Sequence, residues 1–329
     1  MGGNALSVPT RRYSKDEYFQ LQKEITHELW FIYQSVLTIP SYKNKDSFGD
    51  LDLIVNKPKY DNLNYFLEWD LGSKQIVTNG EVVSFEYKEF QVDLIHIDPT
   101  KLHIARTYFS YNDLGMLMGV LAKRLNCKYG HNGLYYNYYN HDRSYKKDIF
   151  LSDEPPVIFN FLDLSYFKFL DGFNDLEDIF KYVTTSKYFD TKAFINEEEW
   201  NHIRRTRNRK RLNWNKFINY LTTNNIQISN PKIEGVKYYV ADYFSKVNLL
   251  EQLDELDHEQ VTKSIIKTKF NGEIVSRLTG LTGKELGAFI SSYKKDKTDF
   301  TGYIVRTEIV DIEQDITEFW LNRQNNYGN

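Results

Sequence analysis

The sequence predicts an α+β fold, in which a compact unit with a mixed or antiparallel sheet is followed by a mainly helical domain and a smaller C-terminal mixed domain. Three observations lead to this prediction. Strand-like runs gather between residues 47 and 98, apolar residues at helical spacing dominate residues 157–225, and both patterns recur beyond residue 232. The 329 residues suffice for several such parts, which we place at residues 1–40 (an N-terminal helix), 41–150 (the sheet unit), 151–230 (helical, with a basic segment) and 231–329.

Composition narrows the class of protein. An apolar fraction of 41% supports a packed core, and the single cysteine, Cys127, excludes an intrachain disulfide or a cysteine-based zinc cluster. We find no apolar run long enough to span a bilayer and no leader segment, so we expect a soluble cytoplasmic protein without a membrane partner. The net charge of −3 argues against coating of nucleic acid by the whole surface, but it allows a local basic patch.

A helix is predicted to begin after Ser14. Ser14 and Glu17 have the spacing of a capping box, in which each side chain satisfies a backbone N–H group of the other residue. The apolar residues that follow at helical spacing are Tyr18, Leu21, Ile25, Leu29, Ile32 and Val36. We therefore expect a helix that ends just before Pro40, because proline disrupts a helix.

The next part of the chain is predicted to be strand-rich. Residues 74–98 contain strand-like runs, and Asn79-Gly80 is a turn signal typical of a hairpin. A helix is expected at 112–126, followed by a strand in the run GLYYNYY at 133–139. Together these elements predict a compact α+β unit over residues 41–140.

The run SFGDLDLIV at 47–55 places two carboxylates in an otherwise apolar strand. Alternation along a strand puts Asp50 and Asp52 on one face, where their like charges repel. A divalent cation would offset that repulsion, and hard carboxylate oxygens suit Mg²⁺. A third aspartate, Asp93, lies in the strand-like run FQVDLI. Three such carboxylates on neighbouring strands can hold two Mg²⁺ ions ~3.5–4 Å apart for phosphoryl transfer. The alternative is that these aspartates never meet.

The order of these elements resembles the nucleotidyltransferase fold of the DNA polymerase beta superfamily. In that family a serine loop precedes a D-x-D strand, and a third aspartate follows on a later strand. Ser41 matches the serine, Gly49-Asp50-Leu51-Asp52 matches G-D-x-D, and Asp93 matches the third position. The resemblance implies that Asp50 and Asp52 ligate two Mg²⁺ ions, with Mn²⁺ as a substitute. It also implies that Asp93 holds the catalytic ion.

The resemblance is closest to the family X DNA polymerases and covers residues 41–140. Their third aspartate precedes a Tyr-Phe segment, a helix and a strand, and here ARTYFSYND at 105–113 is followed by LAKRLNCKYGHNGLYY at 121–136. By this match Tyr108 and Phe109 would line the nucleotide pocket. Ser41 and Lys43, with Lys45 as a further source of charge, would bind the triphosphate. The alternative is that the two aromatic residues form a buried pair at a strand–helix junction.

A basic segment follows in the helical region. Six of the eight residues at 204–211 are basic, namely Arg204, Arg205, Arg207, Arg209, Lys210 and Arg211. Contacts with phosphates provide affinity without base choice, so this segment suits DNA or RNA equally. A solvated helix face is the alternative. Trp214 and Phe217 are expected to anchor the helix rather than to stack on bases.

The tail gives a second, shorter resemblance. The run LTGLTGKELGAFISSYKK at 278–295 is similar to the C-terminal pattern of tRNA nucleotidyltransferases, although an ordinary helix–turn–helix would explain it equally well. Gly280 and Gly283 would supply left-handed backbone conformations, and Gly287 would allow close helix approach.

These observations support three hypotheses. The first is a Mg²⁺-dependent nucleotidyltransferase that adds nucleotides from a (d)NTP to a nucleic-acid 3′ end, as a family X-like DNA polymerase does. The second keeps this chemistry but extends the 3′ end of tRNA or another RNA. The third is an inactive nucleotidyltransferase-like protein that binds nucleic acid or a protein partner.

Overall fold

The structure is a computed structural model, and it describes residues 4–59, 62–196, 202–230 and 233–327. The chain forms two compact units, one of residues 1–138 and 147–247 and the other of residues 139–146 and 248–329. The fold is α+β with a mixed sheet, which confirms the predicted class. The finer division into four parts stays a prediction.

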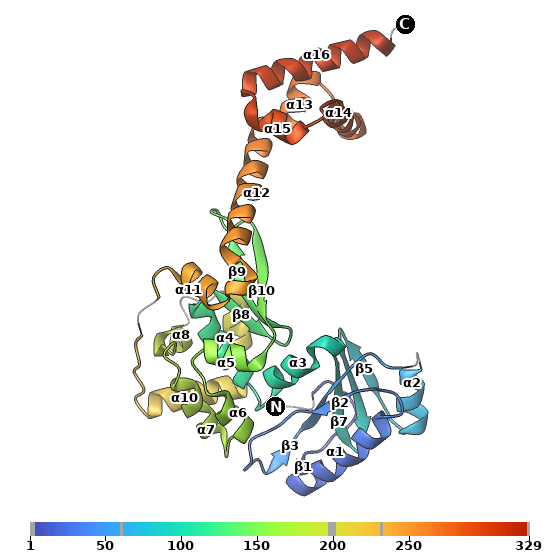
Figure 1. Ribbon diagram of the computed structural model, residues 1–329. Helices are drawn as coiled ribbons and strands as arrows, with labels where there is room; N and C mark the ends of the chain where they lie inside the picture. The colour runs from blue at the N-terminus through green and yellow to red at the C-terminus, as the bar shows by residue number, and fades with distance from the viewer. Residues whose placement is uncertain (1–3, 60–61, 197–201, 231–232, 328–329) are drawn as a thin grey trace. The chain divides into compact units, whose positions relative to one another are not determined.

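A five-stranded mixed sheet forms the framework of the first unit (Figure 1). Its spatial order is β2 (Val36–Thr38), β4 (Asp50–Val55), β7 (Phe90–His96), β6 (Val82–Tyr87) and β5 (Ile76–Asn79). β4 and β7 are parallel, and the other neighbours are antiparallel. The strands predicted at 47–55 and 74–98 are confirmed, and so is the hairpin turn, where Gly80 has a φ of +61°.

The two faces of β4 carry different residues. Leu51, Leu53 and Val55 are buried in the core that the sheet shares with α1 (Lys15–Leu29). Ile54 points to the opposite face, where it packs with Ala105 of α3 (Leu102–Phe109). Because side chains alternate along a strand, Asp50 and Asp52 lie on the same face as Ile54. This face therefore changes from acidic to apolar along a single strand.

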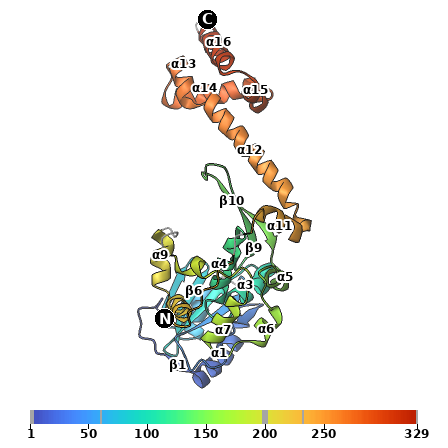
Figure 2. The ribbon, with the colours of Figure 1, turned by 90° about the vertical axis from the view of Figure 1, so that its left-hand side faces the viewer.

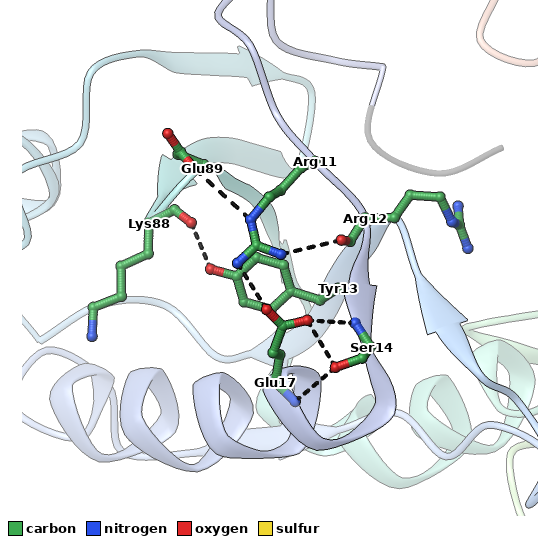
Figure 3. A network of polar contacts seen from close by, with 7 residues as sticks. All are labelled: Arg11, Arg12, Tyr13, Ser14, Glu17, Lys88 and Glu89. Carbon is green, nitrogen blue, oxygen red and sulfur yellow. Dashed lines mark hydrogen bonds and ion pairs between the residues drawn. The ribbon is translucent and has the colours of Figure 1, made fainter.

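The capping box that starts α1 is confirmed, with both of its hydrogen bonds formed (Figure 3). The prediction that this helix continues almost to Pro40 is wrong, because α1 ends at Leu29. Ile32 is buried in the turn that follows, and Val36 opens β2 opposite Val55 of β4. Apolar spacing that fits a helix also fits a turn and a strand that cover the same core, so periodicity alone could not place this boundary.

Helices α3 and α4 (Leu114–Arg124) meet closely at Gly115. A β-carbon there would lie 2.8 Å from Cδ2 of Tyr108 and would also overlap the Tyr108 carbonyl oxygen. A three-stranded sheet follows, in the order β10 (Lys146–Ser152), β9 (Gly133–Tyr139) and β8 (Cys127–Gly130). The helix predicted at 112–126 and the strand predicted at 133–139 are thus confirmed.

The described residues between 155 and 223 form a series of helices joined by short loops, as predicted. The helices are α5 (Pro155–Phe161), α6 (Tyr166–Asp171), α7 (Leu176–Thr184), α8 (Thr191–Ile195), α9 (His202–Arg209) and α10 (Leu212–Thr223), followed by α11 (Val236–Tyr243). Short segments complete the unit: β1 (Tyr13–Ser14), β3 (Ser47–Phe48), α2 (Leu63–Tyr65) and the single turns Phe66–Asp70, Pro99–Lys101 and Ser245–Val247. Trp214 and Phe217 are buried, which confirms that they anchor α10.

The described residues from 248 onward form only helices, so the prediction of a mixed C-terminal domain is wrong. These helices are α12 (Leu249–Lys269), α13 (Gly272–Thr279), α14 (Gly283–Asp296), α15 (Phe300–Arg306) and α16 (Ile309–Tyr327). The last four lie together (Figures 1 and 2) around a core that includes Val275, Phe289 and Ile312. A short apolar run in a sequence does not distinguish a strand from a short buried helix, which explains the error.

Of the three glycines singled out in the tail, two adopt the predicted backbone conformation and the third lacks the predicted close contact. Gly280 and Gly283 have φ values of +74° and +56°, as predicted. Gly287 does not mediate a close helix approach, because a β-carbon there would have no heavy atom within 4 Å. In the described part of the chain no helix is both long and apolar enough to cross a bilayer.

The close approach at Gly115 leads to a test with a control in the same helix. We expect Gly115→Ala to lower the free energy of unfolding by about 1–3 kcal/mol, because the new methyl group overlaps Tyr108. Gly119→Ala should be neutral or stabilising by up to ~1 kcal/mol, since its nearest heavy atom would be the Tyr129 carbonyl oxygen at 3.7 Å. Urea denaturation of both variants measures the difference. Equal stability of the two would contradict the packing described here.

Candidate metal centre

The three aspartates predicted from the sequence meet on one face of the large sheet. Asp52 and Asp93 are register partners on the parallel strands β4 and β7, and Asp50 lies two residues before Asp52. Each residue offers one carboxylate oxygen, and these oxygens lie within 4.8 Å of one another. The alternative that the three carboxylates never approach is therefore wrong.

The proximity of the three carboxyl groups disfavours their ionised forms, because like charges repel. Burial, followed by the charges of Asp50 and Asp93, raises the pKa of Asp52 from 3.8 to about 8. Burial also raises the pKa of Asp93, although hydrogen bonds from Ser84 and Gln91 oppose the effect. Both shifts have the sign expected for carboxylates that lack a strong counter-charge. A divalent cation with oxygen ligands would supply that charge, so the residue set fits Mg²⁺ or Mn²⁺.

Asp93 is held in place by Gln91, a neighbour on the same strand and face. The buried Gln91 donates from Nε2 to both carboxylate oxygens of Asp93, at 3.0 and 2.9 Å. Its own Oε1 accepts a hydrogen bond of 2.9 Å from the backbone N–H of Ala5. The N-terminal segment thus orients the amide that orients the third carboxylate, as outer partners do at metal sites.

Lys45 provides a positive charge beside these acids. Burial lowers its pKa, and the charges of Asp50 and Asp52 act in the opposite direction. The Lys45 ammonium group also lies 4.4 Å from the centre of the Phe48 ring. This lysine therefore offsets part of the repulsion between the carboxylates without reversing the raised pKa of Asp52.

Asp50 and Asp52 line a cavity of about 830 Å³ within the first unit. A volume of this size suits a small-molecule ligand, for which pockets of ≈ 300–1,000 Å³ are typical. Its basic side chains are Arg12, Lys45 and Lys216, which come from three separate segments. Apolar residues in its wall include Ile39, Ile95, Phe109, Leu176 and Leu212. The cavity thus combines acidic metal ligands, cations for an anionic group and an apolar surface.

Only some of the residues predicted to bind a nucleotide line the cavity. Ser41, Gly49 and Phe109 line the cavity with the carboxylates. Lys43 does not line it: its side chain is exposed, and its backbone N–H donates to the carbonyl oxygen of Phe173 at 2.9 Å. Lys45, two residues later, occupies the cavity wall instead.

Of the predicted aromatic pair, Tyr108 and Phe109, only Phe109 lines the cavity. Phe109 is in the cavity wall and stacks against His131, with the ring centres 5.8 Å apart. Tyr108 packs edge-on against Tyr129 at 5.3 Å and does not line the cavity. The two residues are neighbours at the end of α3, and a helix turns successive side chains in different directions. Tyr108 therefore serves as a packing residue, which was the alternative interpretation, whereas Phe109 is placed to contact a ligand in the cavity.

An unusual turn follows this pair. Tyr111 and Asn112 are consecutive residues with positive φ values of 58° and 63°. Such values are uncommon for a residue other than glycine, and they are costly for a bulky side chain. The Tyr111 N–H donates to the Pro40 carbonyl oxygen at 2.8 Å, and its ring packs against Phe169 and Phe173. These contacts stabilise a turn that brings Asn112 and Asp113 into the cavity wall.

The basic segment lies in α9 and at the start of α10. The side chains of Arg204 and Arg207 lie outside the described part of the structure. Arg209 and Lys210 are exposed, and Arg205 is half-buried. Arg211 is half-buried and forms an ion pair of 3.9 Å with Asp113. It also contacts the Met116 sulfur. The charge of Arg211 is thus partly compensated within the protein.

Sequence reasoning missed Arg12, Lys216 and Gln91 as parts of this site. Arg12 and Lys216 are far from the D-x-D run in the sequence, and neither belongs to a recognisable motif. Gln91 could have been predicted from the sequence, because it lies two residues before Asp93 in the same strand and its side chain is therefore on the same face.

No protein-family model matches this chain, and no curated protein matches it in sequence. The chemistry of the site itself must therefore support any proposal for its function.

The raised pKa of Asp52 leads to a prediction for the metal-free protein. The folded state retains a proton that the unfolded state releases near pH 4, so Asp52 lowers the free energy of unfolding as pH rises from about 4 to about 8. Asp52→Asn removes this cost. We expect its melting temperature in EDTA to exceed that of the wild type by a margin that widens over this pH range.

Differential scanning calorimetry at several pH values measures this margin. Asp70→Asn, at an exposed position away from the cluster, is the matched control and should show no such trend. A constant or shrinking margin for Asp52→Asn would contradict the electrostatic description.

Proposed function

We propose that this protein is a Mg²⁺-dependent nucleotidyltransferase that transfers a nucleotide from a (d)NTP to the 3′ end of a nucleic acid. The observation that carries the proposal is the meeting of Asp50, Asp52 and Asp93, whose offered oxygens lie within 4.8 Å of one another. Clustered carboxylates destabilise a fold unless a cation uses them. A cavity of about 830 Å³ with basic side chains adjoins them and suits a nucleoside triphosphate.

The roles of the residues follow from their positions. Asp50 and Asp52 would hold both metal ions, and Asp93, oriented by Gln91, would hold the ion nearest the 3′-hydroxyl. The ions, when bound, stabilise charge on the attacking and leaving oxygens and lower the pKa of the hydroxyl. The 3′-hydroxyl would release its proton to water, and its oxygen would form a bond to the α-phosphorus while the bond from that phosphorus to pyrophosphate breaks and pyrophosphate leaves. Lys45 and Lys216 line the cavity where cations favour the triphosphate.

The acceptor would approach along α9 and α10. Leu212, Asn213 and Lys216 of α10 line the cavity, and α9 with its basic residues immediately precedes this helix. The exposed side chains of Arg209 and Lys210 suit contacts with the phosphates of a nucleic acid. A family X-like DNA polymerase is our first candidate, because the resemblance over residues 41–140 contains all three aspartates.

Addition to the 3′ end of tRNA or another RNA is the second candidate. The observation in its favour is the turn before α14, where Gly280 and Gly283 adopt the left-handed conformations expected from the tRNA nucleotidyltransferase pattern. Both candidates use the same carboxylates. They differ in the acceptor, the sugar and the need for a template.

A primer-extension assay tests the proposal. We expect a labelled DNA or RNA primer to be lengthened with Mg²⁺ and a (d)NTP, and Asp50→Asn to lose this activity by at least ~10²-fold, because metal ligation provides several kcal/mol of transition-state stabilisation. Extension that depends on a DNA template favours the polymerase, and untemplated extension of RNA favours the second candidate. Equal activity of wild type and Asp50→Asn would contradict the proposal.

Metal binding separates an enzyme from the third hypothesis, an inactive relative. We expect Mg²⁺ or Mn²⁺ at a hundred times its Kd to stabilise the wild type by about 2.7 kcal/mol. Asp52→Asn should show no such gain, while Asp70→Asn should behave like the wild type. Thermal melts at constant ionic strength measure the effect. A wild-type melting temperature that does not respond to either ion would favour an inactive binding protein.

A further inference from the structure

Two adjacent arginines in the N-terminal segment point in opposite directions. Arg11 and Arg12 precede β1, where the extended chain places successive side chains on opposite sides. Figure 3 shows Arg11 among the residues around the start of α1 and Arg12 turned away from them. The two residues have the same charge and nearly the same position in the sequence, but their surroundings differ.

Arg11 is neutralised within the protein. Its Nη2 donates to Glu17 Oε1 at 2.9 Å, and its Nε lies 3.8 Å from Glu89 Oε2 (Figure 3). The guanidinium carbon also lies 4.2 Å from the centre of the Tyr13 ring. These contacts are local, and Arg11 does not line the cavity.

Arg12 lines the cavity beside the carboxylates. Its Nε donates to Ser47 Oγ at 3.1 Å and its Nη2 to the Ser47 carbonyl oxygen at 2.9 Å. Both acceptors are neutral, and in the described part of the chain no carboxylate forms an ion pair with Arg12. Its side chain is solvent-accessible. The guanidinium is therefore fixed in direction, and among the described residues no carboxylate lies within ion-pair distance of it.

The backbone fixes this arginine relative to the metal ligands. β1 pairs with β3 so that Tyr13 lies opposite Phe48 and Ser14 opposite Ser47. Only Gly49 separates β3 from Asp50 at the start of β4. Arg12 is thus attached through Ser47 to the chain segment that enters the carboxylate cluster.

We propose that Arg12 binds the phosphate groups of the substrate in this cavity. The inference rests on the proposed function and names the ligand class as a nucleoside triphosphate. Arginine suits this role, because its planar guanidinium offers several N–H donors to phosphate oxygens and keeps its charge at all physiological pH values. Of the residues that the sequence predicts to bind the triphosphate, Ser41 and Lys45 line the cavity and Lys43 does not. Lys45 is half-buried beside the acids.

The test compares Arg12→Ala with Arg11→Ala, which removes the same charge one residue away. Calorimetry with Mg²⁺ measures the Kd for inorganic tripolyphosphate and for each α,β-methylene nucleoside triphosphate, which cannot transfer its nucleotide. We expect Arg12→Ala to weaken both kinds of ligand by about 10- to 100-fold, the range for hydrogen bonds between charged groups. Arg12→Lys should recover part of this loss. Arg11→Ala should bind as the wild type does.

The outcomes distinguish this inference from the proposed function. If Arg12→Ala and Arg11→Ala weaken binding equally, or neither does, the inference is overturned even where Asp50-dependent primer extension is intact. If the wild type does not bind tripolyphosphate or the analogues, the inference is also overturned. If binding depends on Arg12 but no primer is extended, phosphate binding by Arg12 is supported and the proposed nucleotidyl transfer is overturned. The melting temperatures of both variants are measured as a control for folding.

Discussion

The mutual repulsion of Asp50, Asp52 and Asp93 is the constraint on which the rest of the site depends. Their offered oxygens lie within 4.8 Å of one another, and burial together with like charge raises the pKa of Asp52. Such a cluster persists in a fold only where the surrounding structure compensates for its cost. Here α1 and the opposite face of β4 form an apolar core, so the strand stays in place although one of its faces is acidic. Hydrogen bonds from Gln91 hold Asp93 in one orientation.

The positive groups around the cluster come from segments that are distant in sequence. Arg12 belongs to the N-terminal segment, Lys45 to the loop before β3, and Lys216 to α10. The sheet supplies the acids, and irregular or helical segments supply the cations and the apolar wall. This division resembles a general rule of binding sites, in which a rigid framework carries the chemistry and the connecting segments adapt it to a ligand.

Local patterns in the sequence were sufficient for part of this description. Period-2 alternation correctly placed Asp50 and Asp52 on one face, and the capping box at Ser14 and Glu17 correctly marked the start of α1. The end of that helix could not be predicted, because Val36 satisfies helical spacing and strand pairing equally well. The left-handed Tyr111 had no local signal either, since its conformation depends on packing against Phe169 and Phe173. Contacts between remote segments, such as that of Arg12 with Ser47, leave no periodic trace in a single sequence.

The attachment of the N-terminal segment has a consequence for the order in which the site forms. Ala5 is bonded to Gln91, Ser7 and Val8 are bonded to Gln75, and the Arg11 N–H is bonded to the Glu89 carbonyl oxygen. Every one of these partners is synthesised long after the segment itself. The segment therefore stays without these partners until the chain around β5 and β7 has been synthesised, and such non-local closure is slow. The orientation of Asp93 by Gln91 is therefore completed only when this non-local attachment has formed, and a chain that has folded its strands but not yet bound the segment holds the aspartates without that support.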